Sequence, residues 1–68
     1  KIVVDEHTLL KGLTIRESGI REKTSGLVVG IERDGQRILN PESQTVLEWN
    51  DIVWIVGDRK KIQELVKT

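Results

Sequence analysis

The chain of 68 residues contains no cysteine, which excludes disulfide bonds and thiolate metal sites. It has no apolar run near the ~20 residues that a membrane-spanning helix needs, and it shows no signal peptide. Two tryptophans are its only Phe, Tyr or Trp residues, too few for a surface that stacks several bases. Eleven basic and eleven acidic residues cancel to zero net charge, whereas nucleic-acid-binding domains usually carry a basic surplus. We therefore expect no nucleic acid among the partners.

No arrangement of residues indicates an enzyme. His7 is the only histidine, and no serine stands beside a motif that would supply a base. Glycine-rich phosphate loops are absent from the sequence. Thr14 and Glu17 have the spacing of a capping box, which explains both residues by helix stability alone. We expect no catalytic residue, no metal and no required cofactor.

Two apolar runs predict strands that are apolar on both faces, because successive side chains of a strand point to opposite sides: Leu27–Ile31 and Ile52–Val56. The length allows one domain, residues 1–68, and a domain of this size is marginally stable alone. We expect helices to cover one face of the sheet and a second copy of the chain, or another domain, to cover the other. Because Lys1 stands where a complete protein has Met, we also expect the chain to be excised from a longer protein.

Turn and capping signals divide the chain further. The capping box and Gly19 predict a short helix over about residues 14–19, followed by a polar connection over residues 21–25. Asp34 and Gly35 predict a type I′ hairpin turn after a strand over residues 26–33. This turn places Glu32 opposite Arg37.

Three further elements complete the expected fold. Ile2–Val4 is predicted to be a strand, and residues 45–47 a brief one. Asp58 caps a last helix in which three apolar residues share one face: Ile62, Leu65 and Val66. The predicted order is β-α-β-β-(β)-β-α, a small α+β domain with a mixed or antiparallel sheet and two short helices.

Four segments, taken in order, carry a resemblance to a known family. Leu10–Arg21 is similar to the pattern G-x-T-L-x-E-L-x-L-R, and Val28–Gly35 to V-V-A-I-x-R-x-G. Ile38–Leu47 is similar to I-x-x-P-x-x-x-T-x-L, and Asn50–Gly57 to G-D-x-L-x-V-V-G. The chain thus resembles the TrkA-C domain, the C-terminal subdomain of regulators of potassium conductance (RCK). Gly30 stands where the family usually has Ala, a mild departure that leaves the fold intact.

The resemblance implies a cytoplasmic regulatory domain of a bacterial inner-membrane cation channel, transporter or cation/proton antiporter. The partners it implies are a second copy, as a homodimer, and the membrane transport domain of the same polypeptide or complex. It also implies a small effector between the two copies: a cyclic dinucleotide, another nucleotide or a divalent cation. The ending Trp54–Arg59 most resembles the tail of a sodium/proton or potassium/proton antiporter.

The hairpin carries the residues that we expect to bind an effector at the dimer seam: Ile31, Arg33, Arg37, Ile38 and Asn40. With Val29, the two isoleucines would form apolar walls for a base, and an arginine would meet a phosphate. The alternative interpretation is dimer packing with solvated arginines.

Two other clusters have a functional and a structural interpretation. Asp58 and the basic run Arg59–Lys61 stand at a helix start, where they either attract an anion or form a solvated charged surface. Asp5 and His7 either begin a divalent-metal site or form an exposed polar bend.

Three hypotheses follow for the whole domain. The first is a ligand-sensing, dimerising regulatory domain of a monovalent-cation transport system. The second is a ligand-independent dimerisation module, and the third is a nucleic-acid-binding barrel, against which the zero net charge argues.

Overall fold

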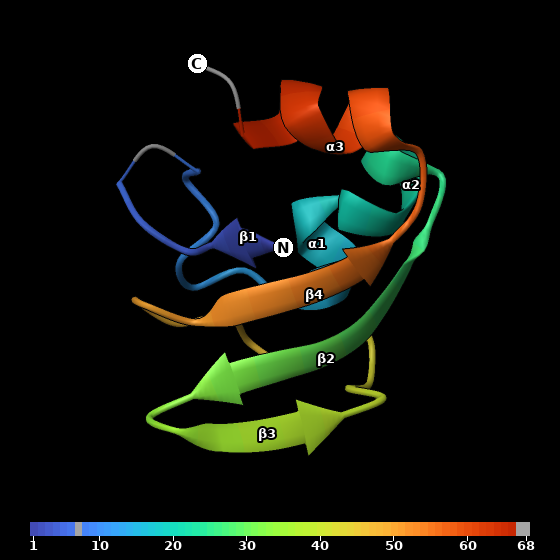
Figure 1. Ribbon diagram of the computed structural model, residues 1–68. Coiled ribbons are helices and arrows are strands. Elements are labelled where there is room, and N and C mark those ends of the chain that lie inside the picture. Colours follow the sequence, from blue (N-terminus) through green and yellow to red (C-terminus); the bar gives the residue numbers. More distant parts are fainter. Residues whose placement is uncertain (7, 67–68) are drawn as a thin grey trace.

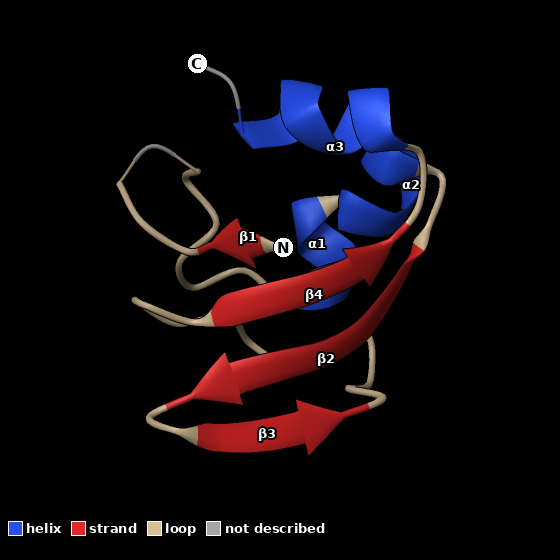
Figure 2. Cartoon of the chain, viewed as in Figure 1, coloured by secondary structure: helices blue, strands red, loops and turns tan. Residues whose placement is uncertain are grey.

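The computed structural model describes residues 1–6 and 8–66. Its elements are β1 (Ile2–Val3), α1 (Ile15–Ser18), α2 (Ile20–Thr24), β2 (Leu27–Arg33), β3 (Gln36–Leu39), β4 (Ile52–Val56) and α3 (Arg59–Val66). The strands form one antiparallel sheet in the order β1-β4-β2-β3. Figure 1 shows α1 and α2 behind this sheet, and Figure 2 shows the long loop between β3 and β4 passing behind it as well. The predicted α+β class is confirmed.

The core lies between the helices and the inner face of the sheet. In the central row, Ile31 is the cross-strand partner of both Val53 and Ile38. Buried apolar side chains from the sheet, the helices and the loops meet there: Ile2, Val4, Leu10, Ile15, Ile20, Val28, Ile31, Leu47 and Val53. Burying each such side chain contributes roughly 1.5–3 kcal/mol, which is the main force that holds these short elements together.

The predicted capping box begins α1. The Oγ1 of Thr14 accepts from the Glu17 amide at 3.0 Å, and the Glu17 carboxylate accepts from the Thr14 amide at 3.0 Å. Hydrogen bonding of the carboxylate to Thr14, chiefly to its backbone amide, lowers the pKa of the Glu17 carboxyl. Gly19 then adopts a left-handed conformation, with φ of 68°, and ends the helix where the sequence predicts.

The predicted polar connection over residues 21–25 is wrong, because most of this segment belongs to α2. Ile20 and Thr24 stand one helical turn apart, and both are fully buried. The Thr24 hydroxyl donates to the Ile20 carbonyl at 2.7 Å, so its polar atom is satisfied inside the helix. The signal was this i, i+4 pair, which the charged residues between the two members obscured.

The predicted brief strand over residues 45–47 is wrong, whereas the predicted last helix forms. Within the described chain, Val46 makes only one isolated bridge to Thr14. The last helix, α3, follows Asp58, and its Ile62 and Leu65 pack against the core. The predicted role of Val66 concerns a side chain outside those that the structure describes.

A bulge in β2 decides which side chains face the helices. The Asp34–Gly35 turn has φ of 51° and 78°, as a type I′ turn requires, and the predicted pairing of Glu32 with Arg37 is confirmed. Pairing with β4 shifts register between Val28 and Gly30, which leaves Val29 as the extra residue. Val28 and Ile31 therefore both point inward although they stand three residues apart.

Gly26→Ala should lower the free energy of unfolding by about 2–3 kcal/mol, the usual cost of overpacking. A β-carbon at Gly26 would lie 2.1 Å from the Val56 carbonyl oxygen, so the backbone has to move. Gly30→Ala is the matched control, because its β-carbon would meet nothing closer than 3.5 Å. Urea titration followed by tryptophan fluorescence measures both, and equal losses would contradict the packing argument.

Candidate functional site

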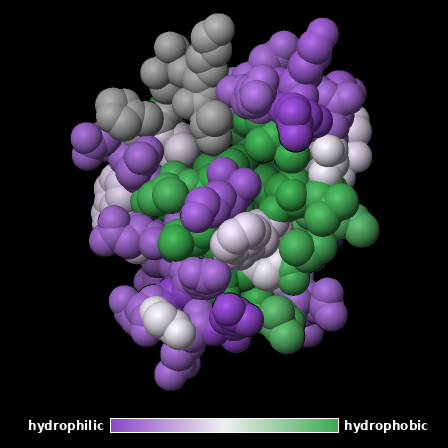
Figure 3. All heavy atoms as spheres, in the orientation of Figure 1, coloured by the Kyte–Doolittle hydropathy of each residue, from purple (hydrophilic) through white to green (hydrophobic). Residues whose placement is uncertain are grey.

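The face of the sheet turned away from the helices is open. Apolar side chains stand exposed on it from each strand: Val3, Leu27, Val29, Leu39, Trp54 and Val56. Figure 3, seen from this side, shows hydrophobic side chains gathered over β2 and β4. These two strands are apolar on both faces, as the sequence predicts.

A hollow of about 240 Å³ lies on this open face where Gly30, which has no side chain, stands between residues of the two neighbouring strands. Gly30 of β2 is the cross-strand partner of Trp54 on one side and of Leu39 on the other. Neighbouring strands lie ~4.8 Å apart, so the backbones that carry these two side chains are about 10 Å apart. The Leu39 side chain leans toward the empty position, because its Cδ2 would lie 3.8 Å from a β-carbon at Gly30. The hollow above Gly30 is thus bordered by Trp54 and Leu39.

Polar groups border the hollow in the next row of the sheet. Glu32 and Arg37, which are cross-strand partners, both line it. The indole Nε1 of Trp54 donates to the Glu32 carboxylate at 3.1 Å, and the Nζ of Lys1 lies 5.3 Å from the indole centroid. Within the described residues, the exposed Arg37 guanidinium forms no ion pair. An apolar gap with an aromatic wall, a carboxylate and a free guanidinium suits a nucleotide-like ligand.

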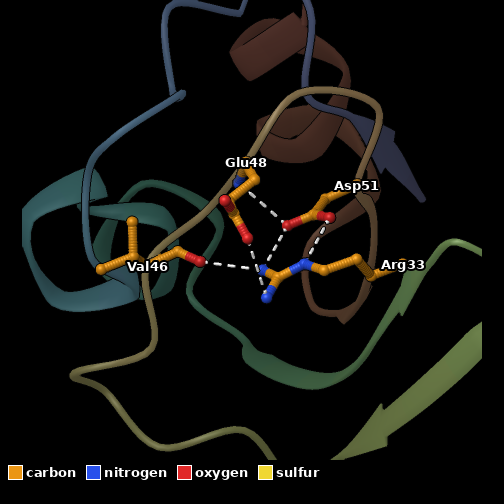
Figure 4. A network of polar contacts seen from close by, with 4 residues as sticks. All are labelled: Arg33, Val46, Glu48 and Asp51. Carbon is orange, nitrogen blue, oxygen red and sulfur yellow. Dashed lines mark hydrogen bonds and ion pairs between the residues drawn. The ribbon is translucent and has the colours of Figure 1, made fainter.

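A polar network around the buried Asp51 lies on the opposite side of the hairpin (Figure 4). The guanidinium of Arg33 donates to both carboxylate oxygens of Asp51, at 2.9 and 2.7 Å, and to the Val46 carbonyl at 2.9 Å. Its Nη1 lies 3.2 Å from the Glu48 carboxylate. The network ties the end of β2 to the loop before β4, so Arg33 holds the fold of the hairpin in place.

Asp51 is ionised in this network although it is fully buried. Burial alone would raise the pKa of its carboxyl, but the Arg33 hydrogen bonds, the Glu48 amide and the Arg33 charge together hold that pKa below its ordinary value. The same pairing raises the pKa of the Arg33 guanidinium, chiefly through the Asp51 hydrogen bond.

The residues expected to bind an effector divide between different surroundings. Ile31 and Arg37 line the hollow, although the Ile31 side chain belongs to the core. Ile38 packs against the core, and Arg33 belongs to the polar network around Asp51. Asn40 is exposed directly after β3, where its backbone amide donates to the Val29 carbonyl.

Four residues of the hollow escaped the sequence prediction. They line it on the open face, but the bulge at Val29 breaks the alternation from which faces are assigned: Gly30, Glu32, Leu39 and Trp54. The usable signal was the hairpin register: counted back from the turn, Gly30 and Glu32 fall on the same face.

The charged cluster at the start of α3 has a structural role. Asp58 accepts from the Lys61 backbone amide at 3.0 Å and so caps α3, while the Lys61 ammonium donates to the Ser25 hydroxyl at 2.8 Å.

The metal site suggested by Asp5 and His7 involves a residue, His7, that lies outside the described residues. Among residues 1–6 and 8–66, no group of three or more His, Asp or Glu residues is arranged to hold a metal ion. No helix in the same ranges is both long enough and apolar enough to cross a membrane.

Comparison with known sequences identifies relatives. The family model of the TrkA-C domain matches residues 1–68. Two curated relatives come from Methanocaldococcus jannaschii: potassium channel protein 1, 29% identical over 75% of this chain, and probable potassium channel protein 2, 25% identical over 96% of it. The matched segments make up 15% and 19% of those two proteins, so this chain spans a small part of their length.

Solved structures show the same fold. The RCK_C domain dimer of S. agalactiae BusR, in complex with c-di-AMP, aligns with a TM-score of 0.77 and 31% identity, covering 91% of this chain and 82% of that one. The RCK C domain of the potassium transport protein KtrA, also in complex with c-di-AMP, aligns with a TM-score of 0.84 and 22% identity over 96% of this chain and 74% of that one.

The expectation of no nucleic-acid partner is wrong for this group of proteins. S. agalactiae BusR in complex with its busA promoter DNA is a structural neighbour, with a TM-score of 0.76 and 30% identity. The match covers 97% of this chain but 33% of BusR. The zero net charge describes only one domain, and it does not exclude DNA as a partner of a longer protein that carries it.

Acid should weaken the fold through Asp51. A carboxyl whose pKa is lowered by folding adds stability above its unfolded-state pKa of about 4, and this stability is lost as the pH falls through the folded-state value. We expect the free energy of unfolding to fall below pH 4, measured by urea titration across pH 2–7. The slope should be much smaller in Asp51→Asn, which also loses about 3–5 kcal/mol near neutral pH. Glu48→Gln is the control, and a wild-type slope carried by Glu48 instead would refute this assignment.

Proposed function

Because the chain belongs to the TrkA-C domain family, we propose that it is a dimerising, effector-sensing regulatory domain of a potassium channel or transporter. The two potassium channel relatives support this context and favour potassium transport over sodium/proton exchange. We place the domain within a longer polypeptide or complex, on the cytoplasmic side of the membrane in which the transport domain lies. Its role is to bind an effector and change the geometry of the transport domain.

The hollow above Gly30 is the observation that carries the proposed effector site. The ligand that we propose is a nucleotide, most specifically a cyclic dinucleotide, because the BusR domain at 31% identity is a dimer in complex with c-di-AMP. Trp54 and Leu39 supply the walls for a base, and Arg37 supplies a charge for a phosphate. Of the residues expected from the sequence, Arg37 contributes its side chain to this site, whereas the Ile31 side chain belongs to the core.

The open face is the proposed dimer seam. It exposes large apolar side chains, with Leu27 at 63% and its cross-strand partner Val56 at 66%. A second copy would remove this surface from water, which gives the association its driving force. Because the hollow lies on the same face, an effector bound there contacts the seam and can favour one dimer geometry over another.

The dimer seam can be tested by a charge. Leu27→Glu should convert the dimer to a monomer, because a carboxylate on the apolar face would have to be buried on association. Leu9→Glu is the matched control, since Leu9 is 79% exposed but lies in the loop before α1. Sedimentation equilibrium measures the mass of each variant. A monomeric wild type would contradict the proposed dimer, and a dimeric Leu27→Glu variant would place the seam elsewhere.

The effector site can be tested by filling it. Gly30→Val should abolish the rise in melting temperature that c-di-AMP or c-di-GMP produces in the wild type, because the side chain occupies the gap between Trp54 and Leu39. Gln36→Val adds the same side chain to an exposed strand position away from the hollow, and the ligand response should persist. A wild-type dimer that ignores both ligands would instead support a ligand-independent dimerisation module.

A further inference from the structure

A second hollow, of about 270 Å³, lies on the helical side of the molecule. Residues of α1, of α2 and of the loop between β3 and β4 line it: Ile15, Arg16, Arg21, Glu22 and Ser43. It shares no lining residue with the hollow above Gly30, and Figure 1 shows its two helices behind the sheet. The Arg16 amide donates to the Ser43 carbonyl at 3.0 Å, so the helical wall and the loop wall are joined by their backbones.

The guanidinium of Arg21 is incompletely bonded at this place. Its Nε is buried and has no hydrogen-bond partner among the described residues. Within residues 1–6 and 8–66, neither Arg21 nor Arg16 forms an ion pair with a carboxylate. A buried donor without an acceptor costs free energy, because it has given up its hydrogen bond to water. An acceptor that enters the hollow and reaches this Nε recovers that free energy.

The Glu22 carboxylate at the rim does not supply this acceptor. Glu22 follows Arg21 directly in α2, and adjacent residues of a helix do not face each other. Glu22 is also exposed, whereas the Arg21 side chain is half-buried. Two guanidiniums against one carboxylate leave an excess of positive charge around the hollow, which favours an anion.

The lining suits a phosphate group. Guanidiniums present planar sets of N–H donors that match phosphate oxygens, and the Ser43 hydroxyl is a further donor in the wall. Ile15, which is 1% exposed, gives the hollow one apolar wall, and charge-assisted hydrogen bonds are stronger where water is excluded. A water molecule takes up about 30 Å³ of the liquid, so the hollow has room for a phosphate group and a short substituent.

We propose that this hollow is an anion site for the phosphate group of free phosphate or of a small phosphate ester. Arg16 and Arg21 bind the phosphate oxygens, and Ser43 donates a further hydrogen bond. The site lies on the side opposite the proposed effector site and does not depend on it, so either can fail without the other.

The Nε–H group of Arg21 reports binding directly. Its proton–nitrogen NMR signal, assigned by its loss in Arg21→Lys, should shift saturably on titration with inorganic phosphate at pH 7. Sodium chloride of the same ionic strength should leave the signal in place. The backbone amide of Ser43 is a second reporter, which stays visible in every variant of the two arginines.

Matched variants assign the charge. Arg16→Gln should raise the dissociation constant for phosphate at least tenfold, because it removes an exposed guanidinium of the site and leaves the core intact. Glu22→Gln should lower it, since a negative charge leaves the rim. Arg59→Gln removes an exposed guanidinium at the start of α3, outside the hollow, and should leave binding unchanged.

Glycerol phosphate distinguishes the two sources of the phosphate group. Tighter binding of this ester than of inorganic phosphate assigns the site to an ester, and the reverse order assigns it to free phosphate. Shifts that stay linear with the concentration of both ligands overturn the site, and so does a dissociation constant that Arg16→Gln leaves unchanged. Equal weakening by Arg16→Gln and Arg59→Gln also overturns it, because the response is then to net charge alone.

Discussion

The bulge at Val29 is the constraint on which the arrangement of both faces depends. The central strand β2 is bonded to β4 on one side and to β3 on the other, so its side chains serve the core and the open face together. One extra residue lets Val28 and Ile31 both reach the core and sends Gly30 and Glu32 outward. Without the extra residue, strict alternation along β2 would turn either Val28 or Ile31 to the open face, because the two stand three residues apart.

The second support is the ion pair that anchors the far end of β2. Arg33 reaches across to Asp51 and Val46, and so attaches the long loop between β3 and β4 to the sheet. That loop also carries Leu47, which is fully buried in the core. A domain of this size has few apolar contacts to spare, so a fully bonded ionic group fixes a loop that apolar contacts alone would hold weakly. This explains why a guanidinium is used for structure here, although arginine is a good phosphate ligand elsewhere.

Local signals in the sequence predicted the parts of the fold that local chemistry controls. The capping box at Thr14 and the turn at Asp34–Gly35 depend on residues three or fewer positions apart, and both form as expected. The helix α2 was missed because its two buried residues are separated by charged ones. The hollow was missed because it depends on which strand lies beside β2 and on the bulge between them. Neither property is written in the spacing of residues along one segment.

With the dimer seam and the effector site that we propose, the position of the hollow on the apolar face would make assembly and effector binding two parts of one equilibrium. A ligand held at a seam strengthens the association of the two chains by the same factor by which their association strengthens the binding of the ligand. The affinity of the domain for an effector would then rise with the concentration of the chain itself. Tethering to a transport protein that holds copies close together would set the effector concentration at which the domain responds.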